Sequence, residues 1–494
     1  MGRDIDLITM GDPVRIRHLA IALTAVVSLT TPTMASVDNS AAAVATTPNV
    51  VLIIVDDARV DDMSSLPQVS SLIGDAGATY ADTYSPFPLC CPARATVLTG
   101  QYAHNHGVLD NEPPLGGFPA FDDAETLATW LTPDYTTGLI GKYLNAYKLP
   151  YRPPGWDHWM VPVGSLYDYR GSTWNVDGVR RTLSGYRTDA TGALATQFIR
   201  AHADDAQPFM LYTAIVAPHA GTPVESDDPN RVYKTSKFPT PNVSDTYHNA
   251  LGKVPNTDPS FNEADVSDKP LRPSKLAPWE IEAIKEVNAQ RREALLSAQD
   301  AVADIVDTLR TTGELDNTYV IFVSDNGYML GDHRIRGGKV FPYEVAARVP
   351  MLIRGPGIPA GSVVNQTVGL QDLAPTILAM TDHTGANGGF TIDGVNILPM
   401  IGNPGLRDGR PQVIEAGPET SSATAYRFHG VVAKVDGVRW KYVERDSGKK
   451  ELYNLGSDSA ELTNVAGKPA FASIQSQLRT LLLNYQWCAG AACR

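Results

Sequence analysis

The stretch Asn49-Val50-Val51-Leu52-Ile53-Ile54-Val55-Asp56-Asp57 decides the fold class of this chain. The part from Asn49 to Val55 is a continuous, mostly β-branched run, which is typical of a parallel strand buried on both faces. Two carboxylates follow this strand directly. Because open α/β sheets bind their ligands at the carboxyl ends of their strands, we expect a polar site beside Asp56 and Asp57.

Strand and helix patterns alternate beyond this run. Short apolar runs that predict further strands lie at 135–141, 209–216 and 318–323. Helical spacing of apolar residues is found at 124–131, 189–202 and 279–310. This alternation predicts an α/β fold with a large, mostly parallel sheet that is covered by helices on both faces.

The pattern changes near the C-terminus. Apolar runs at 431–435 and 438–443 flank Asp436-Gly437, a dipeptide typical of the turn of a β-hairpin. A further strand is predicted at 450–455 and a helix at 470–485. We therefore expect a smaller C-terminal antiparallel sheet with one packed helix.

With 494 residues the chain is too long for one simple core, and it divides into four predicted parts. These parts are a signal peptide (1–35), a low-complexity linker (36–47), the α/β domain (48–387) and a C-terminal α+β subdomain (388–494). Residues 221–278 are rich in Pro, Asp, Ser, Asn and Thr and lack periodicity. A loop of this length predicts a flap over the mouth of the site, and plain disorder is the alternative.

The first 35 residues have the three parts of a secretory signal. Basic residues precede the apolar run 19–29, and Thr33-Met34-Ala35 follows as a small-residue exit. The run is too short to span a bilayer, so we expect export, with an uncleaved anchor as the alternative. Met10 offers an alternative start to Met1.

Charge and cysteine usage narrow the class of protein. The formal net charge of −13 argues against binding to nucleic acid, because the sequence supplies no broad basic surface. Cys488 and Cys493 bracket a loop of small residues, which predicts a local disulfide in an exported protein; an unpaired, frayed end is the alternative. Cys90 and Cys91 are adjacent, and neighbouring cysteines rarely bridge each other.

A second acidic motif follows the run at 318–323. It reads Ser324-Asp325-Asn326-Gly327, so that Asp325 and Asn326 come after one predicted strand as Asp56 and Asp57 come after another. Adjacent carboxylates repel one another, so we expect a cation beside them that offsets this repulsion. Carboxylate and amide oxygens suit calcium or magnesium and lack the softness expected for zinc. A solvated Asp-Asp turn is the alternative.

The motif Cys90-Cys91-Pro92-Ala93-Arg94 opens an apolar run that predicts a helix. Pro92 fits the first helical turn, so that Cys90 lies at the N-terminus and Arg94 follows one turn later on nearly the same face. A helix N-terminus and a guanidinium both favour an anionic group, which predicts a reactive Cys90. The alternative is a buried cysteine at a helix start, with Arg94 merely pairing a carboxylate.

Continued into Leu98-Thr99-Gly100, this motif resembles the signature of the sulfatase family. In that family the first cysteine is oxidised after translation to formylglycine by a formylglycine-generating enzyme, so the resemblance makes Cys90, not Cys91, the nucleophile precursor. It also implies one bound calcium ion per chain, with magnesium as the alternative. The implied metal ligands are Asp56, Asp57, Cys90 as formylglycine, Asp325 and Asn326.

The resemblance implies hydrolysis of a sulfate ester. The hydrated formylglycine attacks sulfur, and its second hydroxyl then expels sulfate and restores the aldehyde. Arg94 is expected to hold the hydrate. Lys142, His219 and Lys339 match family positions that contact the sulfate or the leaving oxygen. Without the resemblance, the alternative interpretation of Arg94, Lys142 and Lys339 is that they are solvated surface cations. The alternative for His219 is a structural histidine.

The chain departs from the family pattern after Lys142. Many sulfatases have a histidine two residues later, where this chain has Leu144. His104 and His106 follow the cysteine signature closely, and we take them as hypothetical substitutes. His333 is a further candidate.

A subgroup of the family shares this departure. The Cys-Cys-Pro start, His104-Asn105-His106 and the stretch 141–145 together resemble N-acetylglucosamine-6-sulfatases and extracellular heparan endosulfatases. The resemblance implies a secreted, extracellular or cell-envelope enzyme that acts on a sulfated amino sugar or polysaccharide and has no membrane span once its signal is removed. Three alternatives stay open: a phosphodiesterase or phosphonate hydrolase of the same superfamily, a non-catalytic secreted glycan-binding protein, and an enzyme that uses Cys90 as an unmodified thiol.

Overall fold

The computed structural model describes residues 47–383, 390–417 and 427–494. The predicted signal peptide and nearly all of the predicted linker lie outside the described residues, as does the predicted domain boundary at 387/388. Residues Thr46–Arg494 form one compact unit. No helix within the described ranges is long and apolar enough to cross a membrane.

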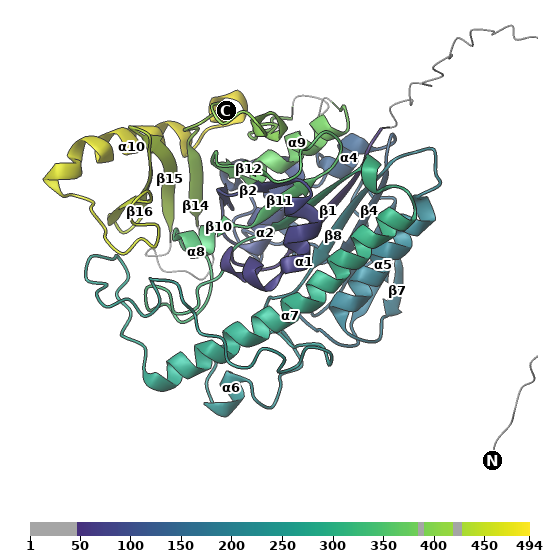
Figure 1. The fold of residues 1–494 in the computed structure, drawn as a ribbon, viewed down its shortest axis with the longest axis horizontal. Helices are drawn as coiled ribbons and strands as arrows, with labels where there is room; N and C mark the ends of the chain where they lie inside the picture. Colours follow the sequence, from purple (N-terminus) through teal and green to yellow (C-terminus); the bar gives the residue numbers. More distant parts are fainter. Residues whose placement is uncertain (1–46, 384–389, 418–426) are drawn as a thin grey trace, which may run out of the picture. The chain divides into compact units, whose positions relative to one another are not determined.

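A ten-stranded mixed sheet forms the centre of this unit, with β1 (Asn49–Val55) in its parallel part (Figure 1). β1 pairs in parallel with β8 (Phe209–Ile215) on one side and with β9 (Thr318–Ser324) on the other, and β4 (Thr136–Gly141) pairs in parallel with β8. Every residue of β1 is buried. The continuous apolar run therefore forms the predicted central strand, with the predicted bounds.

The other strands of this sheet lie toward its two edges. The strand order is β12-β2-β11-β9-β1-β8-β4-β5-β6-β7, and the pairs β2·β11, β11·β9, β5·β6 and β6·β7 are antiparallel. These strands are β2 (Ala78–Tyr80), β5 (His158–Pro162), β6 (Thr173–Val176), β7 (Val179–Thr182), β11 (Met351–Arg354) and β12 (Ser362–Val364). A separate three-stranded sheet contains β3 (Thr83–Tyr84), β10 (Arg348–Val349) and β13 (Val368–Gly369).

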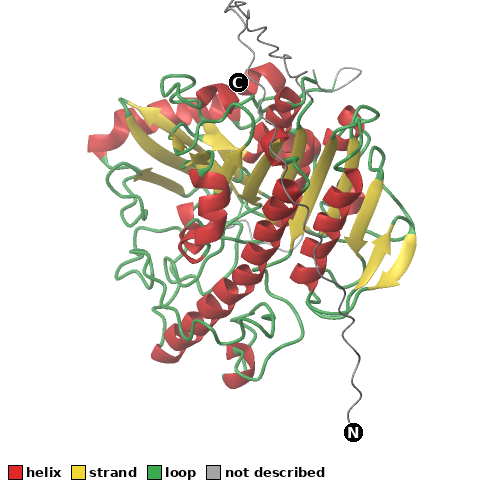
Figure 2. Ribbon diagram, turned by 45° about the vertical axis from the view of Figure 1, so that its right-hand side comes forward, coloured by secondary structure: helices red, strands yellow, loops and turns green. Residues whose placement is uncertain are grey.

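Helices cover both faces of the large sheet, as predicted (Figures 1 and 2). On one face, α5 (Arg187–His202) and α7 (Pro278–Thr311) form a core with alternate residues of β1, Val51, Ile53 and Val55. On the other face, α2 (Cys90–Thr99), α4 (Leu127–Leu131) and α9 (Leu373–Met380) pack against Val50, Leu52 and Ile54. This two-sided burial explains why β1 is apolar at successive positions rather than at alternate ones.

The C-terminal part forms the predicted antiparallel sheet. Its strands are β14 (Gln412–Ala416), β15 (Phe428–Val435), β16 (Val438–Arg445) and β17 (Lys450–Asn454), and α10 (Ala472–Tyr485) packs against it. Asp436 and Gly437 form the hairpin turn, with φ of 54° and 75°. β14 is an additional strand that the sequence analysis did not find. Ile414 and Phe428 share a core with Tyr84 and Phe87 of the preceding part of the chain.

Residues 221–278 are mostly loop, with the short helix α6 (Pro229–Val232). Phe238 and Leu276 pack against Ile284 and Val287 of α7, and the side-chain amide of Asn256 donates a hydrogen bond to the carbonyl of Leu330. This packing gives the segment a defined course, in place of the plain disorder that was the alternative. A role as a flap stays a prediction.

Candidate active site

The carboxyl ends of β1 and β9 bring the two acidic motifs together. The two strands are parallel neighbours whose last paired residues are Val55 and Ser324. The main-chain N–H of Asp57 donates to Asp325 Oδ1 over 3.1 Å, and Asn326 Nδ2 donates to Asp57 Oδ1 over 2.6 Å. All these side chains are buried. The predicted convergence of polar groups at this edge of the sheet is therefore present.

The turn after β1 has an unusual backbone that its neighbours stabilise. Asp57 has φ of 74°, in the left-handed region that most residues with a side chain avoid but that Asp tolerates. Arg291 of α7 donates to the main-chain carbonyl of Asp57 over 2.6 Å, and the N–H of Ala58 donates to the Ser324 hydroxyl over 2.9 Å. These contacts hold the Asp57 carboxylate against the end of β9.

Cys90 is the first residue of α2 and is fully buried. Its Sγ lies 3.2 Å from Asp56 Oδ1 and 2.7 Å from Lys339 Nζ, so the residue implied as the nucleophile precursor meets the acidic cluster directly. Burial and the charge of Asp56 raise the pKa of the Cys90 thiol well above its usual value. A protonated thiol is a poor nucleophile, and this electrostatic environment disfavours the alternative of an unmodified thiol enzyme.

Two buried cations, Arg94 and Lys142, and the partly buried Lys339 neutralise the carboxylates around Cys90. Arg94 Nε donates to Asp325 Oδ2 over 2.9 Å, and its Nη1 donates to the main-chain carbonyl of Lys142 over 2.8 Å. The Lys142 ammonium donates to Asp56 Oδ2, and the Lys339 ammonium donates to Asp57 Oδ1. Burial opposes the charge on both lysines, but the adjacent carboxylates outweigh it and raise the pKa of each lysine. The cluster thus holds positive groups beside position 90.

His219, which follows β8, completes the cluster. Its Nε2 lies 3.8 Å from Asp57 Oδ2, and its Nδ1 lies 2.7 Å from the carbonyl oxygen of Ala220. Since a carbonyl only accepts hydrogen bonds, Nδ1 carries a proton and the neutral ring presents Nε2 as an acceptor. Burial lowers the pKa of His219 to about 4, against the opposing effect of Asp56 and Asp57. The ring is therefore neutral near pH 7.

The cluster fits a divalent cation. Asp56, Asp57, Cys90 and His219 each offer a ligand atom, and these atoms lie within 4.8 Å of one another. Asn326 Oδ1 is buried and accepts no hydrogen bond from the protein, although buried acceptors are nearly always satisfied. Its carbonyl and the nearby carboxylates form the oxygen-rich donor set that hard cations prefer. His219, predicted to contact the substrate, is thus also available as a ligand.

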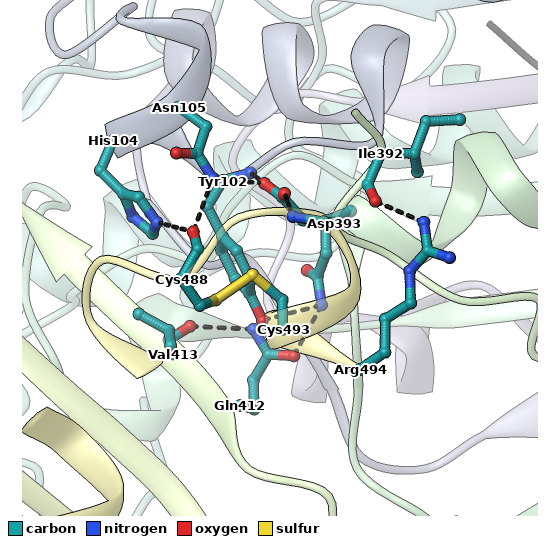
Figure 3. Close-up of a disulfide and its surroundings, with 12 residues drawn as sticks. Tyr102, His104, Asn105, Ile392, Asp393, Gln412, Val413, Cys488, Cys493 and Arg494 are labelled. Atoms are coloured by element: carbon teal, nitrogen blue, oxygen red, sulfur yellow. Dashed lines mark hydrogen bonds between the residues drawn. A yellow bond between two sulfur atoms is a disulfide. The ribbon is translucent and has the colours of Figure 1, made fainter. Parts of the chain in front are cut away.

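The structure places His104, His106 and His333 in other environments. His104 Nδ1 lies 2.9 Å from Glu415 Oε2. Its Nε2 lies 2.9 Å from the carbonyl oxygen of Cys488 (Figure 3). His106 Nε2 lies 3.0 Å from the Thr96 hydroxyl. His333 Nδ1 lies 2.7 Å from a carboxylate oxygen of Glu263. None of these contacts is with the cluster around Cys90, so a substitute role for His104 or His106 stays a prediction without structural support.

The disulfide between Cys488 and Cys493 is present, as predicted (Figure 3). The loop that it closes is attached to the start of α3 (Ala103–His106), which follows α2. Asp393 accepts hydrogen bonds from the main-chain N–H of Gly490 over 2.7 Å and from that of Tyr102 over 2.8 Å. The C-terminal loop therefore stabilises the segment that carries His104, which explains the buried position of this histidine.

Three residues of the site were missed by the sequence analysis. Tyr167 stacks on His219, Asn111 Oδ1 accepts the main-chain N–H of Cys91 over 2.9 Å, and Arg291 holds the turn at Asp57. Only Arg291 has a sequence signal, because it lies on the apolar stripe of α7 at helical spacing from Val287. Asn111 and Tyr167 lie in connections without periodicity, so nothing local distinguishes them.

The fold and the site together define a class, the α/β proteins that gather acidic and basic side chains at the carboxyl ends of the parallel strands of a mixed sheet. Comparison with known families is more specific. The family model described as Sulfatase matches residues 48–383, and the model described as N-sulphoglucosamine sulphohydrolase, C-terminal, matches residues 331–487. This chain belongs to the sulfatase family.

Two curated relatives illustrate the similarity. The chain is 34% identical over 383 residues to the extracellular sulfatase SULF-1 homolog of Drosophila melanogaster, a match that covers 74% of this chain and 32% of that protein. It is 29% identical over 503 residues to the N-acetylglucosamine-6-sulfatase of Homo sapiens, covering 90% of this chain and 86% of that protein. The chain therefore spans about a third of the first relative and most of the second.

Solved structures share the fold. A protein solved in complex with its substrate D-glucosamine-2-N,6-O-disulfate has a TM-score of 0.70 and 22% identity, with 88% of this chain and 97% of that chain covered. The phosphonate monoester hydrolase of Agrobacterium radiobacter has a TM-score of 0.63 and also 22% identity, with 88% and 95% covered. The fold alone therefore does not separate sulfate from phosphonate substrates.

Proposed function

We propose that this protein is an exported sulfatase that hydrolyses sulfate monoesters of a sulfated amino sugar or polysaccharide. The observation that carries the proposal is the buried Cys90 at the start of α2, in contact with both Asp56 and Lys339. Conversion of Cys90 to formylglycine by a formylglycine-generating enzyme would supply the nucleophile at this position. A thiol held protonated by burial gives the unmodified residue little reactivity of its own.

The charged residues have complementary roles in this proposal. Arg94 would hold the hydrate, and Lys142, His219 and Lys339 would contact the sulfate or the leaving oxygen. The positive charge of the two lysines stabilises the negative charge that develops there. One calcium ion, or magnesium as the alternative, would be held by Asp56, Asp57, Asp325, Asn326 and the modified residue 90. When bound, the ion supplies Lewis-acid stabilisation of negative charge. Calcium is preferred over magnesium on the family resemblance.

Different observations support the proposed substrate class and the proposed location. Relatives named N-acetylglucosamine-6-sulfatase and extracellular sulfatase support a sulfated amino sugar, alone or within a polysaccharide. The disulfide between Cys488 and Cys493 is typical of oxidising compartments. We therefore propose a secreted or cell-envelope enzyme whose signal peptide is removed.

The mass of the peptide that contains residue 90 tests the proposal first, in protein from the native host. Oxidation of the thiol to the aldehyde lowers the mass by roughly 18 Da, and the aldehyde reacts with a hydrazide. Turnover of glucosamine 6-sulfate by this protein, and its loss in Cys90→Ala, would complete the test. A fully folded protein that contains only unmodified Cys90 contradicts the proposed mechanism.

The second candidate function is hydrolysis of a phosphonate or phosphodiester. The fold shared with the phosphonate monoester hydrolase favours it, since the same cations could surround a phosphoryl group. A panel of sulfate, phosphonate and phosphodiester esters separates the two by their kcat/KM values. The intact cluster of carboxylates and cations argues against a non-catalytic glycan-binding protein.

A further inference from the structure

Tyr167, in the connection between β5 and β6, contacts two side chains of the cluster at once. Its ring stacks on the imidazole of His219, with centroids 4.1 Å apart and an interplanar angle of 10°. Its hydroxyl oxygen lies 3.4 Å from Lys142 Nζ, and the same ammonium lies 4.8 Å from the centre of the ring. We infer that Tyr167 is a positioning residue for Lys142 and His219; this inference rests on the proposed function and deepens it.

The hydroxyl of Tyr167 has a defined orientation. An ammonium only donates hydrogen bonds, so the hydroxyl accepts from Lys142 and directs its own proton to Asn145 Oδ1, 3.3 Å away. Leu144 is fully buried in the core, at the place where many sulfatases have a histidine. Lys142, which also donates to Asp56 Oδ2, has a second polar contact with the Tyr167 hydroxyl, from a different segment of the chain.

The backbone around Tyr167 is fixed to the segment that carries His219. The carbonyl of Tyr167 accepts the N–H of Thr222 over 2.8 Å, and the N–H of Tyr169 donates to the carbonyl of Thr222 over 2.8 Å. The Tyr169 hydroxyl donates to the carbonyl of His219 over 2.7 Å. A Cβ at Gly221 would lie 2.3 Å from the Tyr167 carbonyl oxygen, so only glycine permits this close approach.

These contacts make Tyr167 suitable for positioning rather than for simple packing. An aromatic stack sets the plane of the imidazole, and a cation held by a hydroxyl and a ring face keeps one rotamer. Lys142 and His219 are the groups proposed to contact the sulfate or the leaving oxygen. Replacement of Tyr167 should therefore lower kcat/KM most for substrates with a poor leaving group, because their leaving oxygen needs the most stabilisation.

The test compares Tyr167→Phe and Tyr167→Leu with the wild type on two substrates. Glucosamine 6-sulfate has a poor alkoxide leaving group, and 4-nitrophenyl sulfate has a good one. We expect kcat/KM for the amino sugar to fall about tenfold in Tyr167→Phe, the effect of one hydrogen bond to a charged group. In Tyr167→Leu, which also removes the stack, we expect a fall of about 100-fold. Losses on 4-nitrophenyl sulfate should be several times smaller.

The matched control is Tyr135→Phe, which removes a tyrosine hydroxyl that donates to the carbonyl of Pro48 over 2.8 Å at the other end of β4. It should leave both kcat/KM values unchanged. The inference would be overturned if Tyr167 variants with the melting temperature of the wild type lost kcat/KM equally on both substrates, or did not lose it at all.

A second readout does not depend on turnover. The NMR signal of the His219 ring should shift in Tyr167→Leu, because the ring current of the stacked tyrosine is lost, and should stay in place in Tyr135→Phe. A wild-type protein that hydrolyses neither ester overturns the proposed function. An unshifted His219 signal overturns the positioning inference, so the two failures are distinguishable.

Discussion

The ammonium of Lys339 lies 2.7 Å from the sulfur of Cys90, although the two residues are 249 positions apart in the chain. The same ammonium donates to Asp57 Oδ1. Lys339 thus connects the residue proposed as the nucleophile precursor with the carboxylates proposed to hold the metal. A side chain in this position can stabilise negative charge at residue 90 and on a bound sulfate.

We expect Lys339→Ala to lower kcat for sulfate esters by about 100-fold, because one preorganised charge is lost beside the reacting atoms. Lys339→Arg should recover part of this loss. Steady-state kinetics on 4-nitrophenyl sulfate would measure both effects, with the exposed Lys468→Ala as the control for loss of a lysine. Unchanged turnover in Lys339→Ala would contradict the assigned role.

Calcium should raise the melting temperature of the protein through the cluster at β1 and β9. Binding of an ion at a concentration 100 times its Kd adds about 2.7 kcal/mol to the free energy of unfolding. Asn326→Ala removes the buried, unpartnered Oδ1 and should abolish most of this shift. The control is Asp227→Asn, in a second group of possible ligand residues that also includes Glu225 and His248. A calcium shift lost in the control and kept in Asn326→Ala would place the ion elsewhere.

His104 should make folding stability dependent on pH. Burial opposes protonation, but the hydrogen bond and charge of Glu415, with contributions from the Cys488 carbonyl and Asp393, raise the pKa of His104 above its ordinary value. A raised folded-state pKa means that the stabilisation is fully present below the unfolded value of about 6.5 and is lost as pH rises through the folded value. Urea unfolding at several pH values should show this loss.

The variants His104→Gln and Glu415→Gln should both flatten this pH dependence, because each removes one partner of the buried pair. Neither should change kcat measured on folded protein. A loss of turnover confined to His104→Gln, with native stability, would instead support the hypothesis that His104 replaces the missing histidine. His106→Ala tests the second candidate in the same way.

Removal of the C-terminal disulfide should weaken the docking of the loop on α3. In the chain-entropy account, a short cross-linked loop contributes about 2 kcal/mol to the free energy of unfolding. We expect the double variant Cys488→Ser, Cys493→Ser to lose about this amount in urea unfolding and to retain turnover when folded. A stability equal to that of the wild type would show that the hydrogen bonds to Asp393 and His104 suffice.

Much of the fold could be predicted because its signals are local. The β-branched run of β1 gives its bounds, and Asp436-Gly437 gives the turn between β15 and β16, since each depends on neighbouring residues only. β14 was missed, because its role depends on pairing with β15 across the chain. Helix bounds in the structure differ from the predicted ones by a few residues, as at α4, where side-chain capping by Thr129 decides the start.

The site could be predicted only in part. The residue types in the two acidic motifs and in the cysteine motif indicate their chemistry, because carboxylates, a cysteine and an arginine have the same intrinsic properties wherever they lie. The residue types do not show which of the ten histidines lies near Cys90. His104 follows the cysteine motif closely but pairs with Glu415, 311 positions away. Tyr167 lies in an unpatterned loop but stacks on His219. Such neighbours depend on how distant segments pack, and local pattern carries no information about that packing.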